Sequence, residues 1–396
     1  MNYGNLKYLG PLVQKEIDNG SMNGSAIRII HNDRIIYDEE FGFADKEKGI
    51  PIRKDTIFRI YSMTKPITAV ALMILYERGM VDLFDPVSDY LEGFRNQKVW
   101  NGQEAEDVKK PVTILDLLHM SSGLIYTDTE THVGRLMNDL YVEADALWKQ
   151  GKPIGTVELC NRIGRFPLTF QPGEQWCYGT SADILGGLIE VVSGKKFGDF
   201  LQEEIFTPLG MTDTGFQVAE NKLPRLAVLY EYIENERRLH PVEWSRTGIG
   251  QNWPAPDFES GGGGLVSTKE DYTRFASMLL NGGSYGDVRI LGRKTVEYMT
   301  GSQLTPELLA YFDNPSQEMW YRSGFNYASL VKVMTNPGRA ASNGSVGEFS
   351  WDGWAGTYFS VSPKDNLILL YMIQRCNGMD MSMIRKLRSI VYSSLD

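Results

Sequence analysis

The feature that most constrains this fold is the presence of strand-like segments at both ends of the chain. Residues 24–30 and 34–43 are predicted to form two strands joined by the polar turn His31-Asn32-Asp33. Four more such segments lie near the other end, at residues 329–335, 348–351, 357–361 and 367–373. Because paired strands must cover an apolar face, we expect one antiparallel sheet built from both termini and flanked by helices. The predicted fold class is α/β (α+β).

Helical patterns occupy the middle of the chain and the spaces between the strands. Apolar residues recur at helical spacing in residues 6–17, 67–76, 113–120, 184–192, 269–280 and 387–395. Gly79 is expected at the C′ position of the second helix. A run of four glycines, residues 261–264, marks the sharpest change in composition. We therefore divide the chain into an α/β part (1–80), an inserted, mostly helical domain (81–261) and a returning α/β part (262–396).

Charge and composition exclude several classes of protein. The 396 residues carry a formal charge of −10, which argues against nucleic-acid and anionic-lipid partners. The four histidines and three cysteines show no metal-ligand spacing, and no nucleotide-binding glycine motif occurs, so we expect no metal and no cofactor. The first twenty residues lack an apolar signal core, and residues 67–76 are too short to cross a membrane. A cytoplasmic protein is predicted; its oligomeric state is left open.

One familiar catalytic motif occurs in the sequence without the context that it needs. Residues 282–286 match Gly-x-Ser-x-Gly, the nucleophile elbow of α/β-hydrolases. That elbow needs a preceding strand and a later histidine, whereas here a helical segment precedes it and no histidine follows His240. A plain glycine turn is the better interpretation.

The informative pattern is Ser-x-x-Lys, which begins at Ser62, Ser193 and Ser329. Ser329 falls in an expected strand, where residues three apart point to opposite faces. Ser193 precedes a glycine at an expected helix end. Ser62 stands at the entrance of the apolar helix, where a hydroxyl and an amine three residues apart share a face. Context therefore selects Ser62.

Ser62 and Lys65 together suggest nucleophilic catalysis. The positive end of the helix dipole favours an alkoxide or oxyanion at Ser62, and burial disfavours the charged form of Lys65, so that a neutral amine can act as base. Pro66 works against this, because it restricts Lys65 and allows the helix to begin after Ser62. From the pattern alone, an N-cap serine followed by a surface lysine is the more frequent arrangement.

Residues 58–65 (FRIYSMTK) resemble the nucleophile segment of the serine β-lactamase and penicillin-binding protein superfamily, in its class C β-lactamase and family VIII esterase branch. Further similar segments follow in the family's order, at residues 112–118, 121–124, 171–174, 208–211 and 263–268. The resemblance spans roughly residues 10 to 390 and implies a β-lactamase/transpeptidase-like fold. It makes Ser62 the expected nucleophile and Lys65 its partner.

The resemblance also assigns the second and third motifs of the family. Tyr178 matches the tyrosine of Tyr-x-Asn and is implied to relay a proton, while Thr180 stands where lactamases usually carry a substrate-binding asparagine. The Lys-Thr-Gly motif corresponds to Trp351-Asp352-Gly353, so that Trp351 and Gly353 are expected to line the substrate site. The implied oxyanion hole consists of the backbone N–H groups of Ser62 and Trp354. Asp352 receives no role.

These residues predict a serine acyl hydrolase that acts on a small-molecule ester or amide, most simply a carboxylesterase with an acyl-enzyme on Ser62. Trp351 cannot offer the cation that lactamases present to a β-lactam carboxylate, which favours esters. One alternative is β-lactamase, D-amino-acid amidase or DD-peptidase-like activity with the same residues. Another, from a different class, is a catalytically idle ligand-binding protein that keeps the fold.

Overall fold

The computed structural model describes residues 3–242, 257–314, 322–376 and 381–395 of the chain. Its centre is an eight-stranded sheet with the strand order β12-β13-β14-β15-β16-β1-β2-β3. The strands are β1 (Gly24–His31), β2 (Arg34–Asp45), β3 (Ile50–Pro51), β12 (Phe325–Tyr327), β13 (Lys332–Met334), β14 (Phe349–Asp352), β15 (Tyr358–Ser362) and β16 (Leu367–Ile373). All neighbouring pairs are antiparallel.

The two ends of the chain meet in the middle of this sheet. β1 pairs with β16 in continuous register from Ser25 opposite Ile373 to His31 opposite Leu367. β1 also forms the predicted hairpin with β2, and Asn32 and Asp33 at its turn have φ of 51° and 60°. Asparagine and aspartate tolerate this left-handed conformation, which a two-residue hairpin turn requires. The sheet built from both termini is confirmed.

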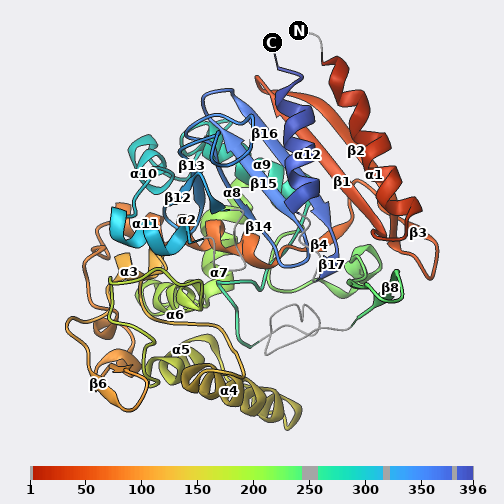
Figure 1. Cartoon of the computed structure of the whole chain (residues 1–396). Coiled ribbons are helices and arrows are strands. Elements are labelled where there is room, and N and C mark those ends of the chain that lie inside the picture. Colours follow the sequence, from red (N-terminus) through yellow and green to blue (C-terminus); the bar gives the residue numbers. More distant parts are fainter. Residues whose placement is uncertain (1–2, 243–256, 315–321, 377–380, 396) are drawn as a thin grey trace.

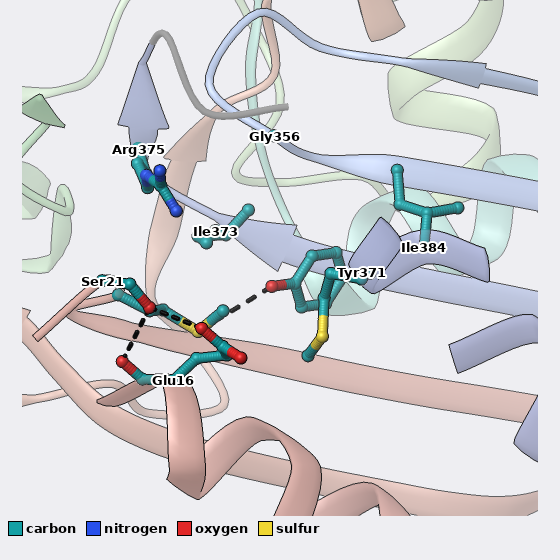
Figure 2. A pocket seen from close by; sticks show the side chains of 9 residues that line it. Glu16, Ser21, Gly356, Tyr371, Ile373, Arg375 and Ile384 are labelled. Atoms are coloured by element: carbon teal, nitrogen blue, oxygen red, sulfur yellow. Dashed lines mark hydrogen bonds between the residues drawn. The ribbon is translucent and has the colours of Figure 1, made fainter. Parts of the chain in front are cut away.

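Helices α1 (Leu9–Asp18) and α12 (Met381–Tyr392) cover one face of the sheet side by side, close to both ends of the chain (Figure 1). Their apolar side chains pack with those of β1 and β16 in a separate core cluster. Figure 2 shows a small cavity in this layer, where Tyr371 donates a hydrogen bond to the sulfur of Met22 at 3.8 Å. Its volume of about 10 Å³ is enough for at most one water molecule.

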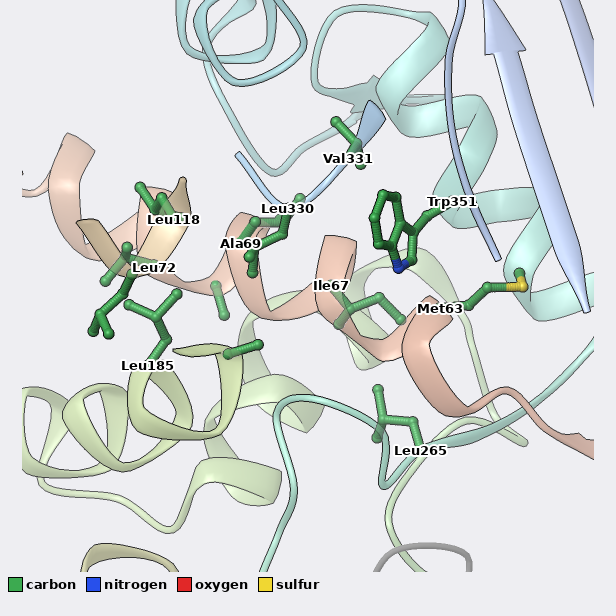
Figure 3. Packing of buried hydrophobic residues seen from close by; sticks show 14 of the residues in the cluster. Met63, Ile67, Ala69, Leu72, Leu118, Leu185, Leu265, Leu330, Val331 and Trp351 are labelled. Carbon is green, nitrogen blue, oxygen red and sulfur yellow. The ribbon is translucent and has the colours of Figure 1, made fainter. Parts of the chain in front are cut away.

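The opposite face of the sheet carries α2 (Thr64–Glu77) and α9 (Lys269–Leu280). Every residue of α2 from Thr64 to Leu75 is buried, and a helix that is apolar all round belongs inside a large core. Figure 3 shows Ile67, Ala69 and Leu72 of this helix among side chains from distant segments. Gly79, with φ of 67°, follows the end of α2 as predicted.

The helical region contributes six α-helices and several shorter pieces among the described residues. The helices are α3 (Ile114–Leu118), α4 (His132–Lys149), α5 (Thr156–Gly164), α6 (Ser181–Ser193), α7 (Phe197–Leu201) and the short turn α8 (Thr207–Leu209). The pieces are η3 (Val87–Asp89), η4 (Glu92–Phe94), η5 (Gln202–Phe206), η6 (Glu220–Arg225), β5 (Lys98–Trp100), β6 (Ala105–Asp107), β7 (Tyr230–Ile233) and β8 (Arg238–Pro241). Residues 243–256 of the predicted helical domain lie outside the described ranges.

The remaining elements are short and connect these layers. They are η1 (Gly4–Tyr8), η2 (Tyr61–Met63), β4 (Ile57–Arg59), β9 (Val266–Thr268), β10 (Ser284–Tyr285), β11 (Val288–Arg289), α10 (Arg293–Met299), α11 (Pro306–Phe312) and β17 (Arg375–Cys376). β4 pairs with β9 directly before the segment that carries Ser62. Gly282 and Gly283 follow α9 with positive φ and lead into the hairpin β10–β11. The Gly-x-Ser-x-Gly sequence at residues 282–286 is therefore a glycine turn, as predicted.

Three predictions near the C-terminus were wrong in detail. The last helix spans Met381–Tyr392 instead of 387–395, because its buried residues begin at Met383 and Ile384. The strand predicted over 329–335 is only Lys332–Met334, since Leu330 has a φ of 62° that no strand allows. The edge strand β12 was missed; its three residues are too few to show an alternating pattern.

Candidate active site

Ser62 lies in the 3-10 turn η2, which joins β4 to α2. Tyr61, the residue before it, has a φ of 42°, a conformation that a bulky residue adopts only when its surroundings hold it there. 

Tyr61 is only 3 % exposed, and its ring makes an edge-to-face contact with Trp354 at a centroid distance of 5.3 Å. This contact brings the end of β14 next to the segment that carries Ser62.

Lys65 occupies the first turn of α2, one helical turn after Ser62. The helix begins at Thr64, so Pro66 does not displace Lys65; a proline is tolerated there because first-turn N–H groups lack helical partners. Lys65 is fully buried, and its Nζ donates to Ser62 Oγ at 3.2 Å. The predicted pairing of hydroxyl and amine is therefore present in the geometry.

Tyr178 reaches the same hydroxyl from the helical region. Its Oη donates to Ser62 Oγ at 2.7 Å, and Lys65 Nζ lies 4.6 Å from the centre of its ring. The loop is held from behind, because Cys177 N–H donates to the Met120 carbonyl at 2.9 Å. Position 179 requires glycine, because a Cβ there would lie 2.1 Å from the Leu124 carbonyl oxygen. Ser62 thus has both proton-transfer candidates within hydrogen-bond reach.

Two further contacts of Lys65 were missed by the sequence analysis. Its Nζ donates to Tyr126 Oη at 2.9 Å and to the Gly262 carbonyl oxygen at 2.7 Å. Burial raises the pKa of Tyr126 well above its ordinary value, so this phenol stays neutral. Together with Ser62, these groups accept three hydrogen bonds from the amine, as many as an ammonium group can donate. No pattern in the sequence distinguishes Tyr126 from the other nineteen tyrosines.

Asp183 supports this arrangement from the first turn of α6. It is fully buried, and its Oδ1 accepts hydrogen bonds from Ser260 Oγ at 2.5 Å and from Gly262 N–H at 2.9 Å. Burial raises the pKa of this carboxyl, while Ser260, the charge of Lys65 and Gly262 oppose the change. Asp183 therefore fixes the turn whose carbonyl binds Lys65 and places a carboxyl group near the amine.

The third motif lies on β14, at the far wall of the site. The Trp351 ring is 5.7 Å from the Tyr178 ring, centre to centre. Its neighbour Asp352 points to the opposite face, since successive strand residues alternate, and contacts Lys332 Nζ at 3.3 Å. Lys332 therefore lies on the face of the sheet opposite to Trp351. Asp352, which received no role, belongs to a buried ion pair.

Gly353 and Trp354 follow directly at the end of β14. A Cβ at Gly353 would lie 2.4 Å from the Ile60 carbonyl oxygen, so only glycine lets the two backbones approach so closely. Ile60 is two residues before Ser62, which brings this strand end and the nucleophile segment together. The oxyanion hole formed by Ser62 and Trp354 N–H groups stays a prediction.

Thr180 is fully buried at the N-terminus of α6. Its hydroxyl has no hydrogen-bond partner within the described part of the chain. The substrate-binding role predicted for it stays a prediction, as do those of Trp351 and Gly353.

The two other Ser-x-x-Lys sequences have structural explanations. Ser193 ends α6, and Gly194 follows in the left-handed conformation with φ of 67°, as predicted. Ser329 lies before β13 and not within it, which corrects the strand assignment, although Lys332 still points elsewhere, toward Asp352.

Two general features bear on the kind of protein this is. Within the described ranges, no three histidine, cysteine or acidic side chains converge as metal ligands. No helix in those ranges has the length and apolar character needed to cross a membrane.

An antiparallel sheet flanked by helices, with a buried lysine in contact with a partly buried serine and tyrosine, defines a serine hydrolase of the penicillin-binding type. The chain belongs to the Beta-lactamase family, whose model matches residues 10–391. The resemblance seen in the sequence is confirmed, and with it the fold class and the enzyme class.

Individual relatives are similar to this protein along nearly the whole chain. Protein Rv1367c of Mycobacterium tuberculosis is 31 % identical over 374 residues, covering 92 % of this chain and 88 % of the relative. Esterase EstB of Burkholderia gladioli is 29 % identical over 377 residues, covering 93 % and 91 % of the two chains. Among solved structures, EstCE1, a hydrolase with promiscuous acyltransferase activity, superposes with a TM-score of 0.82 at 23 % identity, covering 98 % of each chain. This last likeness supports the fold.

Proposed function

We propose that the protein is a carboxylesterase that hydrolyses small esters through an acyl-enzyme on Ser62. The observation that carries the proposal is that Ser62 Oγ lies within hydrogen-bond distance of both Lys65 Nζ and Tyr178 Oη. A serine hydroxyl becomes an effective nucleophile when a neighbouring group accepts its proton. The likeness to esterase EstB gives further support.

In the proposed reaction, Ser62 Oγ attacks the ester carbonyl and its proton passes to the Lys65–Tyr178 pair. The tetrahedral oxyanion is stabilised by the N–H groups of Ser62 and Trp354, and its collapse expels the alcohol, which takes up that proton. Water then attacks the acyl-enzyme, gives its proton to the same pair and releases the carboxylic acid. Ser62 is regenerated, so that one ester and one water yield one acid and one alcohol.

The aromatic third motif supports esters over β-lactams as substrates. Trp351 stands where a lactamase presents a lysine, and the nearest lysine on the neighbouring strand, Lys332, is paired with Asp352 on the other face. A neutral acyl or aryl group suits an aromatic wall better than a carboxylate does. The same residues would otherwise serve a β-lactamase, a D-amino-acid amidase or a DD-peptidase-like enzyme.

The test is covalent labelling of the full chain with a fluorophosphonate, followed by mass spectrometry of the labelled peptide. The proposal expects one adduct on Ser62, none on Ser62→Ala, and loss of nitrophenyl acetate hydrolysis in that variant. An unlabelled wild-type protein would instead favour an idle ligand-binding role. A chromogenic cephalosporin assayed on the same sample separates the substrates, and its preferred cleavage would overturn the ester assignment.

A further inference from the structure

A second cavity lies on the face of the sheet that α12 covers, separated from Ser62 by β14 and its neighbours. Its wall includes Lys332 of β13, Tyr358 of β15 and Arg388 of α12. Its volume is about 420 Å³, within the range of roughly 300–1,000 Å³ that small-molecule sites occupy.

The charge of this cavity is unusual for a chain with a formal charge of −10. Among the described residues, four cationic side chains and no carboxylate line it; the cations are Lys332, Arg339, Arg385 and Arg388. Lys332 and Arg388 are only 2 % and 3 % exposed. Buried cations that converge on one space provide a site for an anion.

Carboxylates outside the cavity lining pair with three of these cations, and one of the three pairs is Arg339 with Asp313. Asp352 Oδ2 lies 3.3 Å from Lys332 Nζ, and Glu348 Oε2 accepts from Arg388 Nη2 at 2.8 Å. Burial lowers the pKa of Lys332, while Asp352 opposes the change, so a further negative charge nearby would stabilise the ammonium form. Side chains that are already fixed lose little entropy when a ligand binds.

The remainder of the wall is largely apolar. It includes Phe325, Ala340, Ala341, Met381 and Ile384. A simple inorganic anion would leave this surface uncovered, whereas an anion with a hydrocarbon body covers it.

We propose that this cavity binds a small organic anion with an apolar body, of the medium-chain carboxylate class. The carboxylate contacts the cations near Arg385 and Arg388, and the hydrocarbon chain packs against Phe325 and Ile384. This site is separate from Ser62 and independent of the proposed esterase activity.

Two other cavities bounded by described residues lack this combination. The small one in Figure 2 has room for a single water molecule. A third, of about 320 Å³, is lined by Asp199, Asp213 and Glu259 as well as Lys222, which disfavours an anion.

The test is isothermal titration of the full-length protein with octanoate, octanamide and acetate. Octanoate is expected to bind, and the two others at least tenfold more weakly, because each lacks either the charge or the hydrocarbon chain. Arg385→Gln is expected to lower octanoate affinity about tenfold, the effect of losing one charged hydrogen bond. Lys386→Gln, on an exposed neighbour outside the cavity lining, is the matched control and keeps wild-type affinity.

A second variant tests the volume without changing charge. Ala340→Leu narrows the cavity and is expected to weaken octanoate binding while leaving the melting temperature close to wild type. The proposal is overturned if octanoate does not bind, if octanamide binds equally well, or if both Arg385→Gln and Ala340→Leu keep wild-type affinity. The last result would place the ligand elsewhere, for example at Ser62.

Discussion

Tyr178 Oη lies 2.7 Å from Ser62 Oγ, although 116 positions separate the two residues in the chain. Tyr178 lies in the loop before α6, and Ser62 lies in the turn before α2. The reaction proposed for this enzyme therefore depends on how these two parts of the chain pack against each other.

Tyr178→Phe is expected to reduce kcat for nitrophenyl acetate by about 10²–10⁴-fold, the usual effect of losing a proton-transfer group. KM should change little, because the ring and its contacts remain. Steady-state kinetics on the purified variant provides the measurement. A kcat within threefold of wild type would show that Lys65 alone moves the proton.

Tyr126→Phe is expected to reduce kcat/KM about tenfold. It removes the hydroxyl that accepts from Lys65 Nζ at 2.9 Å, a charged hydrogen bond worth roughly 1.5–3 kcal/mol. The matched control is Tyr327→Phe, a buried tyrosine whose ring lies 5.4 Å from Trp351 and whose hydroxyl has no partner among the described residues. The control should keep wild-type kinetics; equal losses in both variants would mean that any hydroxyl lost from this aromatic cluster disturbs the site.

The sequence could predict the nucleophile and its amine but not the groups around them. Ser62 and Lys65 are three residues apart, so local helix geometry places them together. Tyr178 was found only through the family resemblance. Tyr126 and Gly262 contact Lys65 across 61 and 197 positions, and no local pattern encodes such distant contacts.

The fold shows the same division between local and distant information. The strand β16 has the predicted bounds, and the helix α2 begins three residues before its predicted start; both were found because they are long, almost uninterrupted apolar runs. The three-residue strand β12 was not, since its pairing with β13 decides its conformation. Asp183 did leave a trace in the sequence, as an acidic residue in the first turn of a largely apolar helix.

Asp183→Asn is expected to shift the acidic limb of the kcat/KM profile to lower pH. Burial raises the pKa of the Asp183 carboxyl, so this group takes up a proton and loses its charge as the pH falls. Asparagine does not titrate, so this loss is absent from the variant. The pH dependence of nitrophenyl acetate hydrolysis provides the measurement. Cys160 and Tyr126 also sense the charge of Asp183, but burial raises the pKa of both and keeps them neutral across this range.

Thr68→Val is the control for this experiment. Thr68 Oγ1 donates to the Gly261 carbonyl at 2.8 Å, so the substitution loosens the same turn without changing any charge. We expect a lower melting temperature and an unshifted pH profile. An acidic limb that moves equally in both variants would assign the effect of Asp183 to the shape of the turn and not to its charge.

Arg388→Met is expected to lower the free energy of unfolding by about 3–5 kcal/mol, because it leaves a buried carboxylate without its partner. Arg388 joins α12 to Glu348, which is fully buried and also accepts from Tyr392 Oη at 2.7 Å. The double variant Arg388→Met/Glu348→Leu should recover most of the loss, since removing both charges also removes their desolvation cost. Denaturant unfolding provides the measurement.

The exposed pair Arg293–Glu297, at 3.1 Å, is the reference, and Arg293→Ala should lower the free energy of unfolding by about 0–1 kcal/mol. If Arg388→Met cost no more than this surface variant, the buried pair would not be what holds the C-terminal helix on the sheet.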